Sequence, residues 1–170
     1  MKITFSVLIL FLATILQITL VPHLSIFGVY PDFVFVLIIF FSILKPIHQS
    51  LIFALVGGLF LDFFTLYPLG AITLSFILIS YLFSFVVQNI LKSHNLATFI
   101  ILGFIGTIIY ETLVSSFIKL ADFIYSFSKI LEFRYNFIYF ILPEAVYNTI
   151  LIFLIFLFFQ CFKQRLLAYK

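Results

Sequence analysis

Residues 57–70 read Gly57-Gly58-Leu59-Phe60-Leu61-Asp62-Phe63-Phe64-Thr65-Leu66-Tyr67-Pro68-Leu69-Gly70, and this stretch decides the fold. Small residues and one acid recur every four positions, at Ser50, Ala54, Gly58 and Asp62. On a helix these positions form one narrow stripe, which another membrane helix can approach closely. Pro68 and Gly70 then break the apolar run, because proline cannot donate a backbone hydrogen bond and glycine tolerates turn conformations. The pattern predicts a membrane helix with one face for protein contact, followed by a turn that starts the next apolar segment.

Composition indicates that lipid is the solvent of this chain. Of its 170 residues, 65% are hydrophobic and only 9% are charged, whereas about a quarter are charged in a soluble domain. So few charges cannot cover a water-facing surface. The net charge of +3 includes no cluster of Lys and Arg, so we expect no nucleic-acid partner. The single Cys161 excludes a disulfide framework and a multi-cysteine metal site.

Apolar runs divide the chain into six predicted spans, because roughly 20 apolar residues cross a hydrocarbon core of about 30 Å. The predicted spans are residues 3–21, 31–45, 50–64, 69–91, 96–120 and 143–162. We therefore predict an all-α integral membrane protein, with residues 1–170 forming a single transmembrane domain, a bundle of six transmembrane helices. The first run is longer than the roughly 7 to 15 residues of a signal-peptide core and lacks a small-x-small cleavage pattern, so we expect a retained span.

Two of these spans, residues 31–45 and 50–64, are short for a bilayer. Pro31 and Asp32 open the first of them, where proline fits the first turn and an acid favours the positive end of the helix dipole. The two runs together are alternatively one re-entrant hairpin. Charge counting favours two spans, because a hairpin leaves Lys45 in the membrane or reverses the orientation of everything after it.

Residues 120–131 have a different pattern from the spans. Their apolar residues lie at 120, 123, 124, 127, 130 and 131, and polar residues lie between them at 122, 126 and 129. This spacing is typical of an amphipathic helix in the plane of the membrane interface. We predict such an interfacial helix on the outer side, with Phe127 on its apolar stripe.

Polar and small residues on the two long spans also share helix faces. Residues 69–91 contain Thr73, Ser80, Ser84 and Gln88, and residues 96–120 contain Gly103, Thr107, Glu111 and Ser115. We expect both stripes to face protein rather than lipid. Glu111 needs an explanation, since a charge inside a span costs a few kcal/mol even by the lowest estimates, about 2.5. It is a proton or cation relay, an anchor for a partner helix, or a protonated acid that hydrogen-bonds within the bundle.

No catalytic or metal-binding set emerges from the residues. The three histidines lie in three different connectors, at His23, His48 and His94. Gly57 and Gly58 lack the Lys and Ser/Thr of a phosphate loop, and helix packing explains them better. We therefore predict no enzyme activity and no cofactor. Asp62 is expected to form the turn before Pro68 with access to water, or to act as a structural lock or partner contact.

The chain resembles the MreD family of rod shape-determining membrane proteins. The residues that carry the resemblance are Pro31-Asp32, Gly57-Gly58-Leu59-Phe60-Leu61-Asp62, Pro68-Leu69-Gly70, and Pro143 with Tyr147-Asn148. With the polar residues above, the packing or partner-binding candidates are Pro31, Asp32, Gly57, Gly58, Asp62, Pro68, Gly70, Glu111, Phe127 and Asn148.

This resemblance implies a non-enzymatic scaffold in the bacterial cytoplasmic membrane. It implies that the chain binds MreC, and through it the MreB filament and the RodA glycosyltransferase with its partner transpeptidase. The alternative is a substrate-binding membrane subunit of an energy-coupling-factor vitamin transporter, which shares a six-helix plan. Such subunits need a polar ligand pocket and Ala-x-x-x-Ala faces, and the chain has no such alanine motif.

The distribution of Lys and Arg predicts that both termini are cytoplasmic. With six spans, one side holds Lys2, Lys45, Lys92, Lys163, Arg165 and Lys170, and the other holds Lys119, Lys129 and Arg134. A reporter that is active only outside the cytoplasm should therefore give signal when fused after residue 30, 66 or 128, and none after residue 94 or 170. Signal at residue 170 would contradict the six-span arrangement.

Overall fold

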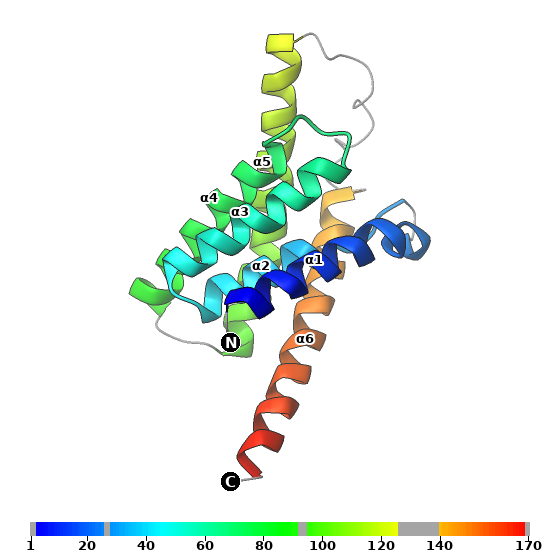
Figure 1. Cartoon of the computed structure of the whole chain (residues 1–170). Coiled ribbons are helices and arrows are strands. Elements are labelled where there is room, and N and C mark those ends of the chain that lie inside the picture. The colour runs from blue at the N-terminus through cyan, green and yellow to red at the C-terminus, as the bar shows by residue number, and fades with distance from the viewer. Residues whose placement is uncertain (1–2, 26–27, 92–94, 126–139, 169–170) are drawn as a thin grey trace.

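In a computed structural model, which describes residues 3–25, 28–91, 95–125 and 140–168, the chain is a bundle of helices (Figure 1). The helices are α1 (Ile3–Thr19), the 3-10 helix η1 (Val21–Leu24), α2 (Phe33–Leu44), α3 (Ile47–Phe64), α4 (Ala71–Phe85), its π-helical continuation η2 (Val86–Leu91), α5 (Leu96–Tyr125) and α6 (Leu142–Ala168). The described ranges contain no β-strand. The prediction of an all-α protein is confirmed for these residues.

Four helices of the described part of the chain are long and apolar enough to cross a membrane. They are Ile47–Phe64, Ala71–Leu91, Leu96–Ala121 and Leu142–Gln160. The other two apolar helices are shorter, since α1 has 17 residues and α2 has 12. The chain is thus a helical membrane protein, and the count of six spans stays a prediction.

Several helix boundaries differ from the predicted ones, and α6 continues past residue 162 to Ala168. α3 begins at Ile47 instead of residue 50, because Pro46 occupies the position before the first turn and its carbonyl accepts the N–H groups of Gln49 and Ser50 at 3.0 and 3.1 Å. α5 continues past residue 120 to Tyr125, so the first six residues of the predicted interfacial segment belong to α5. The rest of that segment, with Phe127, lies outside the described residues.

The short helix α2 lies at the centre of the bundle. It contacts α1, α3, α4, α5 and α6, and nine of its 12 residues are buried. Phe35 stacks on Tyr110 of α5 with ring centroids 4.8 Å apart, and Phe40 packs against Phe99 of α5 at 4.9 Å. A helix that is apolar on all sides belongs in a core, and α2 has that place.

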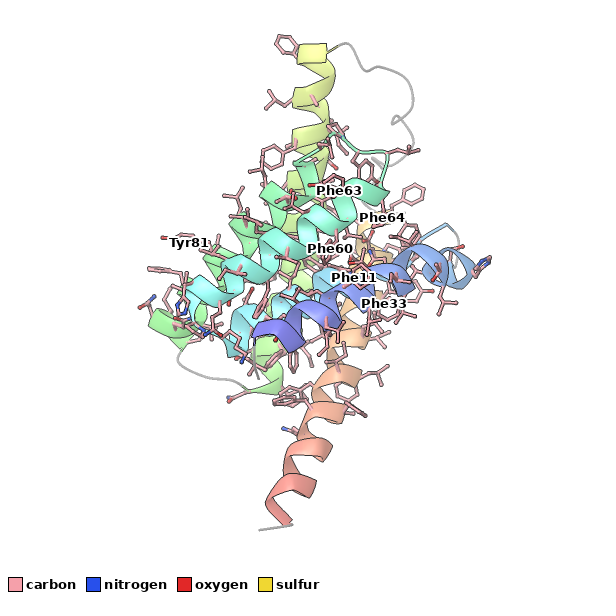
Figure 2. All side chains as sticks on the ribbon, in the orientation of Figure 1. Phe11, Phe33, Phe60, Phe63, Phe64 and Tyr81 are labelled. Carbon is pink, nitrogen blue, oxygen red and sulfur yellow. The ribbon has the colours of Figure 1, made fainter. Side chains whose placement is uncertain are left out.

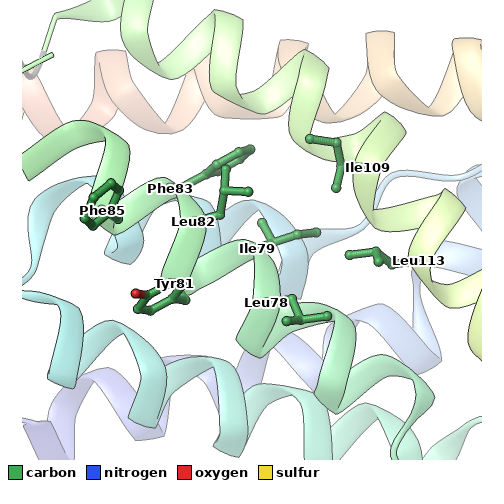
Figure 3. Close-up of a pocket in the computed structure, with 8 residues that line it drawn as sticks. All are labelled: Leu78, Ile79, Tyr81, Leu82, Phe83, Phe85, Ile109 and Leu113. Carbon is green, nitrogen blue, oxygen red and sulfur yellow. The ribbon is translucent and has the colours of Figure 1, made fainter. Parts of the chain in front are cut away.

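The outer surface of the bundle is covered by apolar side chains. Figure 2 shows mostly carbon on the faces that point away from α2, including the labelled Phe11, Phe60 and Tyr81. A hollow of about 420 Å³ lies between α4 and α5, and its lining is aliphatic or aromatic (Figure 3). Tyr81 carries the one hydroxyl among these lining side chains. The hollow lacks the converging polar groups that orient a small-molecule ligand.

Candidate functional site

Asp62 lies in the last turn of α3, and its carboxylate caps the start of α4. Oδ2 accepts the backbone N–H groups of Gly70 and Thr73, both at 3.1 Å, and also the Thr73 hydroxyl. Oδ1 accepts the N–H of Ile72 at 3.1 Å. A carboxylate at this end of a helix satisfies N–H groups that have no partner in the helix and interacts favourably with its dipole. Asp62 therefore caps α4 from the preceding helix, in place of a side chain at the N-cap position of α4 itself.

Gly70 explains why the cap comes from another helix. It occupies the N-cap position of α4 with a φ of 95°, a left-handed conformation that favours glycine. Glycine has no side chain that can accept a hydrogen bond, so the N–H groups of the first turn need an acceptor from elsewhere. The carbonyl of Pro68 accepts the N–H of Ala71 at 3.1 Å, which closes the turn.

Gly58 lets α3 and α4 approach closely one turn before Asp62. A Cβ atom added at Gly58 would lie 2.5 Å from the backbone Cα of Thr73, which no side-chain rotation can relieve. Gly57 faces α2 and α1, where an added Cβ would lie 3.1 Å from Ile38 and 3.5 Å from Leu10. The glycine pair therefore packs α3 against three helices at one level.

The N-terminus of α2 is bonded by side chains from three segments. The side chain of Asp32 accepts the N–H of Phe35 at 2.8 Å. Gln17 of α1 accepts the N–H of Val34 at 2.9 Å, and Asn148 of α6 accepts the N–H of Asp32 at 2.8 Å. Asn148 also donates to Thr107 of α5 at 3.4 Å. Four helices thus meet at this end of α2.

The C-terminus of α2 is bonded in the same manner, by side chains that bind its carbonyl groups. Ser84 of α4 donates to the Ser42 carbonyl at 3.0 Å, and Gln88 of η2 donates to the Lys45 carbonyl at 3.0 Å. Ser50 of α3 donates to the Phe41 carbonyl at 3.1 Å. The Ser42–Ser80 hydroxyls pair at 2.9 Å, and Thr73 bonds Asp62. The stripe predicted to face protein on residues 69–91 is confirmed for the buried Thr73, Ser80 and Ser84, whereas Gln88 is exposed.

A small polar cavity lies beside the N-terminus of α2. It has a volume of about 50 Å³, and three carboxylic acids line it, Asp32, Glu111 and Glu144. Thr65 also lines it, and the buried Thr65 hydroxyl has no hydrogen-bond partner within the protein. A water molecule needs about 10 to 15 Å³ of such volume, so the cavity has room for a few waters. Across the described residues, no three His, Cys, Asp or Glu are arranged to hold a metal ion.

The family described as rod shape-determining protein MreD matches residues 1–165. The chain belongs to the MreD family. Neither the curated proteins nor the solved structures contain a match. The MreD family comprises shape-determining membrane proteins and is not a known enzyme family. The resemblance seen in the sequence is thereby confirmed, and it extends over nearly the whole chain.

The candidates chosen for this MreD-family chain fall into two neighbouring groups. Gly57, Gly58, Asp62, Pro68 and Gly70 lie along the contact of α3 with its neighbours and in the turn to α4. Pro31, Asp32, Glu111 and Asn148 lie near the N-terminus of α2. Phe127 lies outside the described residues.

One expectation about the acids needs correction. Asp62 is predicted to have access to water if it serves the turn, but only 2% of it is exposed, because the N–H groups of α4 surround it. The sequence also does not predict that Glu111 lines a cavity together with Asp32 and Glu144. Sequence position alone does not reveal this, since the three acids are brought together only by the packing of α2, α5 and α6.

Sequence reasoning missed the role of Gln17 and Ser42. Gln17 is a strongly polar residue within the otherwise apolar first run, and its side chain bonds the backbone of α2. Ser42 exchanges hydrogen bonds with two serines of α4. A polar side chain isolated in an apolar run is the signal for both, because in lipid such a group needs a partner on another helix.

We predict that Gly58→Ala destabilises the bundle and that Gly103→Ala does not. An added Cβ at Gly58 meets backbone, so the helices must separate, and overpacking of this kind costs about 1 to 3 kcal/mol. At Gly103 the atom met is the Cδ1 end of the Ile152 side chain, which can rotate away. Thermal midpoints of the detergent-purified proteins should fall for Gly58→Ala only. Equal midpoints for the two variants would contradict close packing at Gly58.

Proposed function

We propose that the chain is a non-enzymatic scaffold subunit of the bacterial cell-elongation machinery, which binds MreC and helps to position peptidoglycan synthesis. Through MreC it acts with the MreB filament and with RodA and its partner transpeptidase. The observation that carries this proposal is the family match over residues 1–165. The vitamin-transporter alternative gains no support, because the polar cavity of about 50 Å³ is far smaller than the roughly 300 Å³ or more of small-molecule sites.

The chemistry of the polar side chains supports a scaffold. Asp62 of α3 binds the backbone of α4. Asn148 of α6 and Gln17 of α1 bind the backbone at the start of α2. Their hydrogen-bonding groups therefore hold the bundle together. In this proposal the candidate residues act by giving the partner a rigid surface, and none of them performs chemistry on a substrate.

The partner surface that we propose is the outer end of α5 with the segment that follows it. α5 extends beyond the α3–α4 turn in Figure 1, and this extension presents Leu120 at 54% and Phe123 at 88% exposure. Exposed apolar residues next to a membrane suit contact with another protein. We propose that Phe123 and Phe127 contact the membrane-proximal part of MreC.

Six spans with both termini in the cytoplasm complete the proposal. The difficulty with six spans is α2, since its 12 residues rise only about 18 Å. With Lys45 at one interface, the N-terminal end of α2 lies below the opposite membrane surface. Side chains of α1 and α6 bind the N–H groups at that end, so its backbone groups have partners within the apolar layer.

We predict that Asp62→Ala strongly impairs rescue of rod shape in cells that lack the native protein, and that Asp62→Asn has an intermediate effect. Alanine leaves the N–H groups of Gly70, Ile72 and Thr73 without their acceptor, and each unsatisfied group costs about 1 to 3 kcal/mol. Asparagine keeps one acceptor oxygen, while its NH₂ group faces a backbone donor. Cell width and length at matched protein levels are the measurement. Normal shape with Asp62→Ala would show that the α4 cap is dispensable.

We predict that Phe127→Glu and Phe123→Glu reduce co-purification with tagged MreC while membrane insertion is retained. A carboxylate on the apolar stripe must be desolvated when the partner binds, which opposes association. Phe123→Leu is the matched control, because it keeps an apolar side chain at the same exposed position. Full recovery of MreC with both Glu variants would assign this surface to lipid.

A further inference from the structure

The turn between α3 and α4 carries a cluster of exposed apolar side chains. Their exposed fractions are 72% for Phe63, 61% for Phe64, 85% for Leu66 and 76% for Leu69. Figure 2 shows the labelled Phe63 and Phe64 at the end of α3 next to this turn. A turn in water is normally polar, and a contiguous apolar surface indicates contact with lipid or with protein. We name residues 63–69 the hairpin tip.

The opposite end of the same hairpin carries polar residues beside the exposed Ile90 and Leu91. α3 starts after Lys45 and Pro46 and has His48 and Gln49 in its first turn, and η2 ends the hairpin with Gln88 and Asn89. No charged residue lies between Asp62 and Lys92, and Asp62 itself is buried. The hairpin therefore has one end suited to a membrane interface and another suited to acyl chains.

The length of the hairpin also favours a tip that lies among the acyl chains. The 18 residues of α3 rise about 27 Å, which is already less than a hydrocarbon core of about 30 Å. Figure 1 shows α3 and α4 inclined to α5, so the height of the hairpin along α5 is smaller still. If Lys45 lies at one interface, as the six-span arrangement predicts, the tip reaches the opposite leaflet and lies close to its acyl chains.

Backbone N–H groups at the tip have hydrogen-bond partners within the protein. A backbone amide near hydrocarbon needs a partner within the protein. Asp62 accepts the N–H groups of Gly70, Ile72 and Thr73, and the N–H groups of Thr65 and Ala71 bond to carbonyls at 2.9 and 3.1 Å. With these bonds, five N–H groups at and after the turn have partners within the protein.

We propose that the hairpin tip is a membrane anchor whose four apolar side chains insert among the lipid acyl chains of the leaflet at the Asp62 end of the bundle. The occupant of this surface is lipid, and neither water nor a second protein covers it. The proposal concerns the position of the chain in the bilayer, and it is independent of whether MreC is the partner.

Tryptophan fluorescence tests this position directly, because the chain contains no Trp and an introduced one reports alone. Leu66→Trp probes the tip in vesicles whose phospholipids are brominated near the glycerol end of the acyl chain. Leu55→Trp, in the middle of α3 at 44% exposure, is the lipid-facing control, and His48→Trp is the control at the polar end. All three positions are exposed, so the larger ring fits without repacking.

The expected result is that Leu66→Trp and Leu55→Trp are quenched by the brominated lipid and emit at shorter wavelength than His48→Trp. Acrylamide in the aqueous phase should quench His48→Trp more than the other two. Stronger quenching of Leu66→Trp by acrylamide than by brominated lipid would place the tip in water and overturn the proposal. Protection from both quenchers would mean that protein, such as a second copy of the chain, covers the tip, and would overturn it as well.

Discussion

A backbone N–H or C=O group in hydrocarbon has no water to bind, and this constraint governs the centre of the structure. α2 has its N-terminal end inside the bundle, where each unsatisfied group costs several kcal/mol, roughly 4 or more in an apolar medium. The N–H groups at one end are bound by Gln17, Asn148 and Asp32. The carbonyl groups at the other end are bound by Ser50, Ser84 and Gln88. The polar residues of the surrounding helices are placed where α2 needs them.

The α3–α4 hairpin obeys the same constraint by a different route. Its close contact at Gly58 is possible only without a Cβ, and this contact brings the end of α3 to the beginning of α4. Asp62 is then near enough to bind three N–H groups and one hydroxyl of α4. Packing and capping therefore depend on each other here, because a wider spacing between the helices would remove the acceptor from the groups that it binds.

Local patterns were enough to predict part of this arrangement. Residues four apart must share a helix face, so the stripes that end in Asp62 and Gln88 were visible without a structure. The central place of α2 was not predictable in this way, because a short apolar run is compatible with a core helix, a tilted span or one arm of a hairpin. Gln17 and Asn148 are 131 positions apart in the chain and meet at the same helix end, and nothing in the sequence pairs them.

The distance along the chain between α2 and Asn148 bears on how the protein is made. The N–H of Asp32 is bound by a side chain 116 residues later, so that amide has no native acceptor while the ribosome is still adding α3, α4 and α5. During this interval the N–H of Asp32 needs another hydrogen-bond partner, such as water. Chains that end before Asn148 therefore lack one of the three side-chain acceptors at the N-terminal end of α2.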